Sequence, residues 1–246
     1  MLRCVLDSLR IQSHTPAEVI ISEDGADPLM HQFVANYNWF CPYQHLTQAD
    51  LGWRKNRALN RAVLAANHEW LIFIDGDCVL HPRFVEMHMR YAAPNRILLG
   101  KRVKLSPSLS QRILNGNTLY PTKWWRLFNS GCRYADEGIF LPIFLDKPMR
   151  STRHLTGCNM SFSREAILSI NGFNEEYVKP AVGEDADIDW RFRGMGYEVF
   201  SVRNRAIVYH LYHRESWTNQ DDNLAIMRRH QQLNQLVCPN GINQHI

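Results

Sequence analysis

A chain of 246 residues can bury one substantial core, and its 45% hydrophobic and 21% charged residues are typical of a globular protein. The formal charge of +4 is mildly basic without any dense basic run, which argues against a nucleic-acid partner and fits an anionic ligand or an acidic membrane surface. No apolar run reaches the roughly 18 residues of a membrane span. The six cysteines lack the spacing of a zinc module or a disulfide framework, so a cytoplasmic location is expected.

Apolar periodicity and turn signals predict alternating helices and strands along most of the chain. Helices are expected at residues 2–12, 28–37, 53–66, 82–92 and 164–170, in a segment that ends near residue 194, and at 221–237. Strands are expected at residues 18–22, 44–47, 70–74, 97–100, 156–163, 197–202 and 206–209. Such alternation is typical of a doubly wound α/β sheet.

The strand from Trp70 to Ile74 is the feature around which the chain is organised, because five large apolar residues end abruptly at Asp75-Gly76-Asp77. A short continuous apolar run indicates a strand covered on both faces. Two carboxylates at its end repel each other unless a cation lies between them, and oxygen ligands suit Mg²⁺ or Mn²⁺. The alternative is a strand followed by a polar turn, since Asp-Gly is a common turn pair.

Residues 105–150 show no clear periodicity, and the segment contains four prolines and the pair Trp124-Trp125. Long irregular segments in compact domains often cover a substrate, although this one could equally serve packing. The two tryptophans fit either a sugar-stacking platform or the core. Core packing is the preferred interpretation, because aromatic side chains bury large areas.

A second acidic cluster holds four carboxylates within six residues: Glu184, Asp185, Asp187 and Asp189. The helix dipole favours one or two acidic residues in a first turn, but not four that repel one another. Asp185 and Asp189 lie four residues apart on one helical face, which destabilises a helix unless a ligand or partner offsets the repulsion. A carboxylate at such a helix start is well placed as a general base.

His210 and His213 follow the apolar run at 206–209. A lone histidine is more often structural, but two histidines at the end of an expected strand can complete a metal site in a chain that already offers Asp75 and Asp77.

In their order and spacing, six short motifs resemble the signature of the family 2 glycosyltransferases with the GT-A fold. The motifs are Ser22–Gly25, Lys55–Arg57, Phe73–Asp77, Gly172–Glu175, Gly183–Asp185 and His210–His213. The later part resembles a galactosyltransferase-like C-terminal region. The resemblance implies a Rossmann-like mixed α/β sheet flanked by helices. It also implies one domain over residues 1–220, with a nucleotide-binding half (1–104) and an acceptor-binding half (105–220), followed by a C-terminal helix and tail (221–246).

The resemblance also implies roles for individual residues. Asp185 is the implied catalytic base, and Glu184 orients the acceptor. Metal binding is implied for Asp75, Asp77, His210 and His213, of which His213 matches the family better than His210. Donor binding is implied for Asp24, Arg54, Lys55, Asp75, Gly157 and Asn159, with Asn56 as a further candidate. The amide of Asn159 could equally be a hydrogen bonder at a strand end.

The predicted function is that of an inverting hexosyltransferase that uses Mn²⁺ or Mg²⁺ and moves a sugar from a UDP-sugar to a saccharide or lipid-linked acceptor in surface polysaccharide biosynthesis. Peripheral contact with the inner membrane face is part of this hypothesis. Family members normally open with an apolar strand that this sequence lacks, so the alternative is a truncated, catalytically impaired protein that only binds a sugar nucleotide or glycan. A nucleotidyltransferase or hydrolase ranks last, because no Walker-type loop or H-E-x-x-H helix is present.

Overall fold

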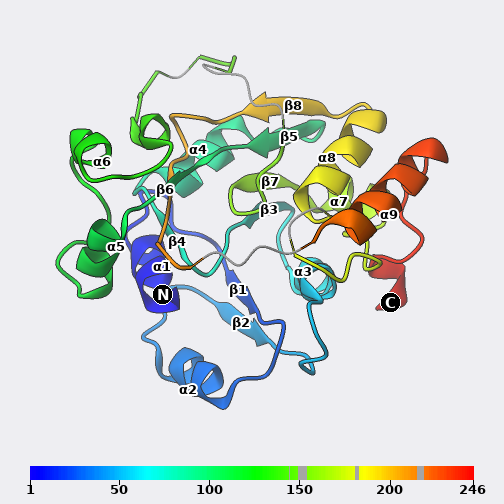
Figure 1. Ribbon diagram of the computed structural model, residues 1–246, viewed down its shortest axis with the longest axis horizontal. Coiled ribbons are helices and arrows are strands. Elements are labelled where there is room, and N and C mark those ends of the chain that lie inside the picture. Colours follow the sequence, from blue (N-terminus) through cyan, green and yellow to red (C-terminus); the bar gives the residue numbers. More distant parts are fainter. Residues whose placement is uncertain (144, 149–153, 181–182, 215–218) are drawn as a thin grey trace. The chain divides into compact units, whose positions relative to one another are not determined.

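A computed structural model describes residues 1–143, 145–148, 154–180, 183–214 and 219–246 (Figure 1). Two compact units share the chain. Unit 1 comprises Met1–Pro16, Ile72–Phe162 and Val199–Ser216, and unit 2 comprises Ala17–Leu71, Ser163–Glu198 and Trp217–Ile246. Both units combine segments from either side of residue 104, and the predicted functional division at that residue stays a prediction.

Most predicted elements are present with boundaries shifted by a few residues. The helices are α1 (Leu2–Arg10), α2 (Pro28–Asn36), α3 (Lys55–Ala65), α4 (Phe84–Tyr91), α5 (Pro107–Leu114), α6 (Trp125–Asn129), α7 (Arg164–Ser169), α8 (Asp185–Gly194) and α9 (Asp221–Gln232), with 3₁₀ turns η1 (Ala135–Gly138) and η2 (Ile242–Gln244). The strands are β1 (Val19–Ser22), β2 (Tyr43–Leu46), β3 (Trp70–Phe73), β4 (Cys78–Leu80), β5 (Arg96–Leu99), β6 (Arg102–Lys104), β7 (Met160–Ser163), β8 (Glu198–Ser201) and β9 (Val208–His210). None of these helices is long and apolar enough to cross a bilayer.

The strands form three sheets with both parallel and antiparallel pairs. A four-stranded sheet has the order β3-β7-β5-β8, with β5 and β7 antiparallel, and its strands lie wholly or partly in unit 1. Unit 1 also holds a three-stranded sheet of order β4-β9-β6, in which β4 is antiparallel and β6 parallel to β9. The mixed α/β sheet implied by the resemblance is confirmed. The prediction that β3 is covered on both faces was wrong: its four residues are only half-buried. β3 is also an end strand in the order of its sheet.

In unit 1, helix α1 packs against β4 through buried apolar and polar side chains (Figure 1). Val5 and Leu6 are buried, and the hydroxyl of Ser8 accepts a hydrogen bond of 3.1 Å from the Leu80 amide. The side-chain oxygen of Gln12 accepts one of 3.0 Å from the Val85 amide. Two backbone amides are therefore satisfied by polar side chains, that of Ser8 in α1 and that of Gln12 just after α1.

In unit 2, helix α3 packs against the parallel strands β1 and β2. Two polar residues of this helix, Asn56 and Asn60, are buried beside Ala58 and Val63. The side chain of Asn60 forms two hydrogen bonds of 2.8 Å with the backbone of Phe173, as donor to its oxygen and acceptor from its nitrogen. A helical pattern shows which positions face inward, but it does not reveal that a polar one holds a distant loop.

The segment 105–150 is more regular than its sequence suggested, although residues 144, 149 and 150 lie outside the described part. Helix α5 begins after Ser106, whose hydroxyl accepts a hydrogen bond from the Leu109 amide, and Pro107 occupies its first turn. A serine followed by proline is a recognised helix start, so this signal was present in the sequence. The preference for Trp124 and Trp125 as core residues was wrong, since they are 48% and 49% exposed.

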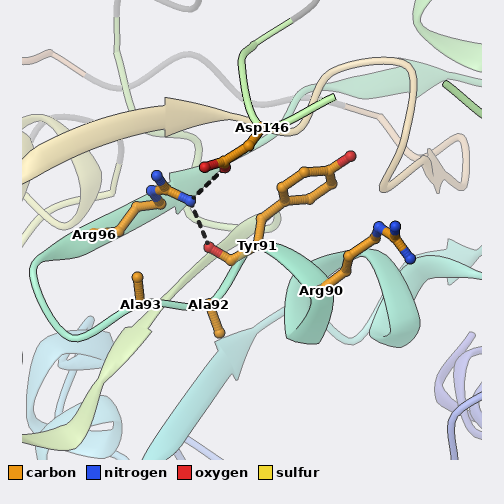
Figure 2. A pocket seen from close by; sticks show the side chains of 6 residues that line it. All are labelled: Arg90, Tyr91, Ala92, Ala93, Arg96 and Asp146. Atoms are coloured by element: carbon orange, nitrogen blue, oxygen red, sulfur yellow. Dashed lines mark hydrogen bonds and ion pairs between the residues drawn. The ribbon is translucent and has the colours of Figure 1, made fainter. Parts of the chain in front are cut away.

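A hollow in unit 1 lies at the C-terminal end of α4, and an arginine bridges its rim (Figure 2). One nitrogen of Arg96 donates to the backbone oxygen of Tyr91 at 3.3 Å and lies 3.1 Å from the carboxylate of Asp146. The hollow is lined by Arg90, Tyr91, Ala92, Ala93, Arg96 and Asp146. None of the predicted site residues lines it.

Candidate functional site

Asp77, His210 and His213 form a compact cluster in unit 1. Antiparallel pairing of β4 with β9 sets Cys78 opposite His210, which brings the preceding Asp77 beside the end of β9. One carboxylate oxygen of Asp77 lies 3.3 Å from Nε2 of His210 and 3.1 Å from Nε2 of His213. Two motifs more than 130 residues apart in the sequence are thus joined by the register of one strand pair.

The environment of Asp77 favours its ionised form. Burial alone would raise the pKa of this carboxyl, but the hydrogen bond from His210 and the nearby imidazole charges lower it below its usual value. The side chain of His213 is 40% exposed, against 10% for His210, so solvent reaches the cluster from the His213 side. A carboxylate with two imidazoles suits Mn²⁺ better than Mg²⁺, which prefers oxygen ligands alone.

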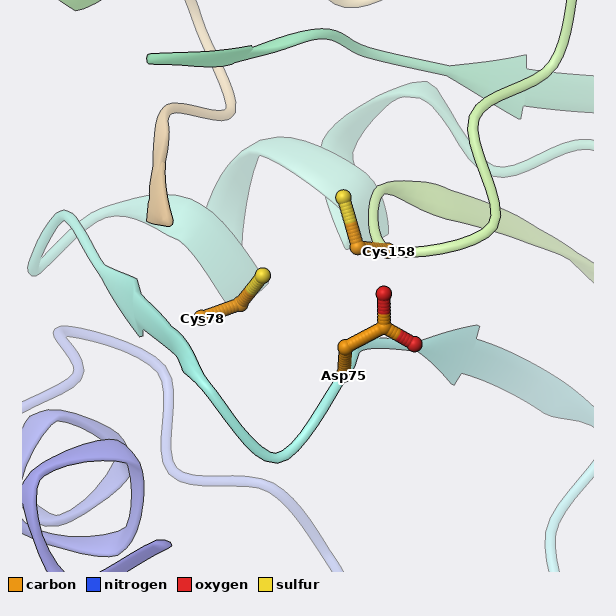
Figure 3. Close-up of side chains that lie close together, drawn as sticks. All are labelled: Asp75, Cys78 and Cys158. Atoms are coloured by element: carbon orange, nitrogen blue, oxygen red, sulfur yellow. The ribbon is translucent and has the colours of Figure 1, made fainter. Parts of the chain in front are cut away.

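Asp75, the other carboxylate of the predicted metal pair, belongs to a different cluster. Its carboxylate and the thiols of Cys78 and Cys158 have donor atoms within 4.8 Å of one another (Figure 3). The cluster built on Asp77 contains the two histidines and not Asp75. Joint coordination of one ion by both aspartates stays a prediction.

The predicted donor-binding residues Asp24 and Arg54 contact each other in unit 2. One carboxylate oxygen of Asp24 accepts a hydrogen bond from the Arg54 amide just before α3, and the other accepts one of 2.7 Å from the side-chain amide of Gln48. The Arg54 guanidinium donates to the backbone oxygen of Ala49. These bonds fix the acidic bend after β1 against the start of α3.

Lys55, Glu184 and Asp185 lie at two helix starts within unit 2. The ammonium of Lys55 lies 2.8 Å from the carboxylate of Glu184, with side-chain exposures of 30% and 14%. Asp185 opens α8, and its carboxylate accepts a hydrogen bond of 2.7 Å from the Ala186 amide. An ion pair therefore joins a predicted donor-binding residue to the predicted acceptor-orienting one.

Asn159 serves as a buried hydrogen-bonding hub of unit 1. Its amide nitrogen donates to the backbone oxygens of Lys101 and Ala206 at 2.8 and 3.0 Å, and its oxygen lies 3.0 Å from Nε2 of His88. Burial lowers the pKa of His88 to about 4, so that imidazole is neutral at pH 7. These contacts match the strand-end alternative for Asn159, while the donor-binding roles of Asn159 and Gly157 stay predictions.

Sequence reasoning missed two buried cysteines, Cys78 and Cys158, and two ion pairs in α8. Cys78 directly follows Asp75-Gly76-Asp77, which was an available signal, but Cys158 is brought to it only by folding. Asp187 lies 2.7 Å from Nε of Arg191, and Asp189 lies 3.1 Å from Nε of Arg193. Both arginines stand four residues after their aspartates and offset the repulsion within the acidic cluster.

Comparison with known proteins identifies the family. The model of Glycosyl transferase family 2 matches residues 1–169, well over half of the chain. The chain belongs to glycosyltransferase family 2. A second model, described as the N-terminal domain of galactosyltransferase, matches residues 144–214 of this family 2 chain. No match was found among curated proteins.

Solved glycosyltransferase structures share the fold of this family 2 chain. Residues 1–349 of S. aureus TarS in complex with UDP-GlcNAc are 15% identical, with a TM-score of 0.57, 93% of this chain covered and 61% of that one. GalNAc-T7 with UDP, GalNAc and Mn²⁺ is 12% identical, with a TM-score of 0.55 and coverages of 86% and 41%. The mannosyltransferase PcManGT from Pyrobaculum calidifontis, with GDP-Man and Mn²⁺, is 17% identical, with a TM-score of 0.53 and coverages of 96% and 58%. The predicted GT-A fold is confirmed. The chain spans 61% of the length of the TarS fragment, 41% of GalNAc-T7 and 58% of PcManGT.

Proposed function

We propose that this family 2 chain is an inverting, metal-dependent glycosyltransferase that takes a sugar from a UDP-sugar and delivers it to a saccharide or lipid-linked acceptor in surface polysaccharide biosynthesis. The observation that carries the proposal is the cluster of Asp77, which follows β3, with His210 and His213 at the end of β9. Its carboxylate and imidazole donors fit Mn²⁺. The complexes of TarS with UDP-GlcNAc and of GalNAc-T7 with UDP and Mn²⁺ support the choice of donor and metal.

The predicted site residues would have separate roles towards the metal, the donor and the acceptor. Asp77, His210 and His213, together with Asp75, would hold the metal, which when bound neutralises negative charge on the donor diphosphate. Asp24 would contact the uridine, and the basic residues Arg54 and Lys55 the nucleotide, with Gly157 and Asn159 bordering the donor sugar.

Asp185 would accept the proton of the acceptor hydroxyl while the acceptor oxygen attacks the anomeric carbon from the face opposite the UDP, which inverts the configuration. Asp185 lies in the first turn of α8, where the helix dipole interacts favourably with negative charge. Glu184, held by Lys55, would orient the acceptor.

Thermal unfolding with UDP and Mn²⁺ tests the donor site. At a UDP concentration about 100 times Kd, binding adds about 2.7 kcal/mol to the free energy of unfolding. For a chain of this size, that raises the melting temperature by about 5–10 °C. We expect this rise with UDP and Mn²⁺ together, and no rise with UDP in EDTA. An equal rise without metal would contradict metal-dependent binding, and a larger rise with GDP would contradict a UDP donor. Release of UDP from UDP-sugars upon addition of an acceptor then separates transfer from binding alone.

A basic, aromatic segment supports the membrane part of the proposal. Residues 101–135 contain no acidic residue, so the segment carries +7, and the rest of the +4 chain carries −3. Its basic residues are Lys101, Arg102, Lys104, Arg112, Lys123, Arg126 and Arg133. Such a concentration of positive charge complements an anionic lipid surface. Each basic residue near that surface contributes about 1 kcal/mol to the free energy of binding.

Within this segment, an aromatic patch formed by Lys123, Trp124, Trp125, Arg126 and Phe128 is exposed. The three aromatic side chains are 48–50% exposed, and the Trp124 ring lies 6.0 Å from that of Trp125 and 6.1 Å from that of Phe128. Tryptophan flanked by basic residues is characteristic of membrane–water interfaces. We propose that the patch contacts an anionic membrane peripherally, on its cytoplasmic face, where a lipid-linked acceptor would be found.

Co-sedimentation with vesicles tests the aromatic patch. Binding to vesicles of phosphatidylcholine and phosphatidylglycerol should fall at least about tenfold in the Trp124→Ala/Trp125→Ala variant, because two interfacial anchors are lost. It should also weaken with added salt. The variant Leu51→Ala removes a side chain that is 72% exposed in unit 2 and serves as the matched control. Equal binding to neutral vesicles, or binding of a soluble glycan in place of vesicles, would contradict the assignment.

A further inference from the structure

A buried arginine of unit 1 stacks on a residue that lines the hollow at the end of α4 (Figure 2). Arg205 is fully buried, and the carbon of its guanidinium lies 4.6 Å from the centre of the Tyr91 ring. Its Nη2 donates hydrogen bonds of 3.2 and 3.0 Å to the backbone oxygens of Leu145 and Lys147. Its Nε and Nη1 are buried and have no hydrogen-bond partner in the part of the chain that the structure describes. Two donors of a buried charged group therefore lack an acceptor, which costs free energy.

The hydroxyl of Tyr91 is a further unpaired group at the hollow. Tyr91 is 4% exposed, and its hydroxyl has no hydrogen-bond partner among the described residues, although buried phenol hydroxyls usually find one. The face of its ring attracts the positive charge of Arg205. That face offers no lone pair to the N–H groups of the guanidinium. The two stacked side chains can therefore offer three hydrogen-bond donors, Nε, Nη1 and the hydroxyl, to a ligand that accepts hydrogen bonds.

The charges around the hollow favour an anion as that ligand. Arg90 and Arg96 line it together with Asp146, and Arg205 adds a third guanidinium, so three positive charges and one negative charge leave +2. Asp146 pairs with Arg96 at 3.1 Å, but its side chain is 78% exposed, and water screens its charge. Burial lowers the pKa of Arg205, and the Asp146 carboxylate offsets only part of this effect. An anion in the hollow would compensate the remaining positive charge.

We propose that this hollow binds a phosphate monoester, carried by a soluble small molecule or by a lipid headgroup. Such a phosphate carries close to two negative charges at pH 7, which match the +2 of the surrounding groups. Arg90 and Arg96 are the contacting cations, because a guanidinium binds phosphate through two parallel hydrogen bonds. Arg205 stacks on the Tyr91 ring, so a small rotation of this ring exposes its Nε and Nη1 to the phosphate.

The surroundings of the hollow also suit an organic phosphate. Its volume of about 510 Å³ is within the range of small-molecule sites and leaves room for more than an inorganic ion. The carbonyl of Tyr91 at the end of α4, which would repel an anion, already accepts a hydrogen bond from Arg96. The inference does not depend on the proposed transfer activity.

Titration calorimetry of the full chain with glycerol 3-phosphate in EDTA tests this site. EDTA removes metal ions, so a phosphate held through a metal ion does not contribute. We expect binding that saturates at one molecule per chain, and at least about tenfold weaker binding of acetate at the same ionic strength. Arg96→Gln and Arg205→Met should each weaken phosphate binding at least about tenfold, because each removes a charged donor. Tyr91→Phe removes only the unpaired hydroxyl and should weaken it about threefold.

Arg229→Gln is the matched control for Arg96→Gln. The side chain of Arg229 is 54% exposed and pairs with Glu176 in unit 2, so the same change is made at a paired arginine far from the hollow in sequence. It should leave phosphate binding unchanged. Vesicles of phosphatidylcholine with phosphatidic acid present the same phosphate monoester on a lipid. Vesicle binding that falls in Arg96→Gln assigns a lipid headgroup, and vesicle binding that does not respond to this change assigns a soluble phosphate.

Three results would overturn the assignment. They are the absence of glycerol 3-phosphate binding by folded wild-type protein, unchanged affinity in both Arg96→Gln and Tyr91→Phe, and loss of binding in Asp77→Asn, which would place the phosphate at the cluster of Asp77 with the two histidines. Circular dichroism checks the fold of each variant, and the changes at Arg96 and Tyr91 keep the test decisive if Arg205→Met folds poorly. Mn²⁺-dependent stabilisation by UDP is a separate measurement, so failure here is distinguishable from failure of the proposed function.

Discussion

Replacing Asp77 by asparagine is expected to abolish the Mn²⁺-dependent stabilisation by UDP. One carboxylate oxygen of Asp77 lies within 3.3 Å of both imidazoles, and this residue is the only carboxylate in the cluster, among the residues that the structure describes. An amide retains the shape but carries no charge, so attraction for a dication is lost. Because changes even outside the coordinating shell cost about 10–100-fold in metal affinity, we expect at least about 100-fold here. Isothermal titration with Mn²⁺, followed by UDP, measures the loss.

Asp222→Asn is the matched control for Asp77→Asn. The side chain of Asp222 is 72% exposed and forms an ion pair with Lys179 in unit 2, so the same chemical change is made at a carboxylate outside the predicted site. It should leave Mn²⁺ and UDP binding unchanged. Circular dichroism of each variant checks that the fold is retained. Unaltered metal-dependent UDP binding by a folded Asp77→Asn protein would exclude Asp77 as a metal ligand.

The sequence predicted this cluster in part, because both of its halves end apolar strands. The run before Asp75 and the run before His210 each stop at polar residues, and the ends of such strands are where α/β proteins bind ligands. The β4–β9 register that sets Cys78 opposite His210 could not be predicted, since β4 is three residues long and lacks a pattern of its own. Sequence reasoning therefore grouped Asp77, His210 and His213, which the structure brings together, but it did not show that Asp75 lies in another cluster. Their roles as metal ligands stay predictions.

Burial was harder to predict than secondary structure. Helix α3 and strand β3 were located correctly, yet two asparagines of α3 are buried and the apolar residues of β3 are only half-buried. Trp124 and Trp125 were expected in the core, yet they are 48% and 49% exposed. Periodicity reports the local conformation, whereas burial depends on neighbours that are distant in the sequence. Where a local chemical signal existed, as in Ser106-Pro107 before α5, the element was predictable.

Replacing Asp187 by alanine is expected to cost about 3–5 kcal/mol of unfolding free energy, the largest stability effect that we anticipate. Asp187 and Arg191 are paired at 2.7 Å with side chains that are each 1% exposed. The hydroxyl of Tyr177 donates a hydrogen bond of 2.9 Å to the same carboxylate, and burial raises the pKa of that phenol. Removing the carboxylate leaves a buried guanidinium and a buried hydroxyl without their acceptor. The midpoint and slope of urea unfolding give the change.

Two comparison variants separate this mechanism from a general loss of packing in α8. Asp222→Ala breaks the exposed pair with Lys179 and should cost about 0–1 kcal/mol, as is usual for surface ion pairs. Asp187→Leu/Arg191→Met removes both charges and should recover most of the stability lost in Asp187→Ala, because a buried ion pair can often be exchanged for apolar groups of similar volume. If the double variant is as unstable as Asp187→Ala, the uncompensated guanidinium is not the cause. In that case the instability of the double variant comes from lost hydrogen bonds: the one from the Tyr177 hydroxyl to Asp187 and the one from the Arg191 guanidinium to the backbone oxygen of Ile170.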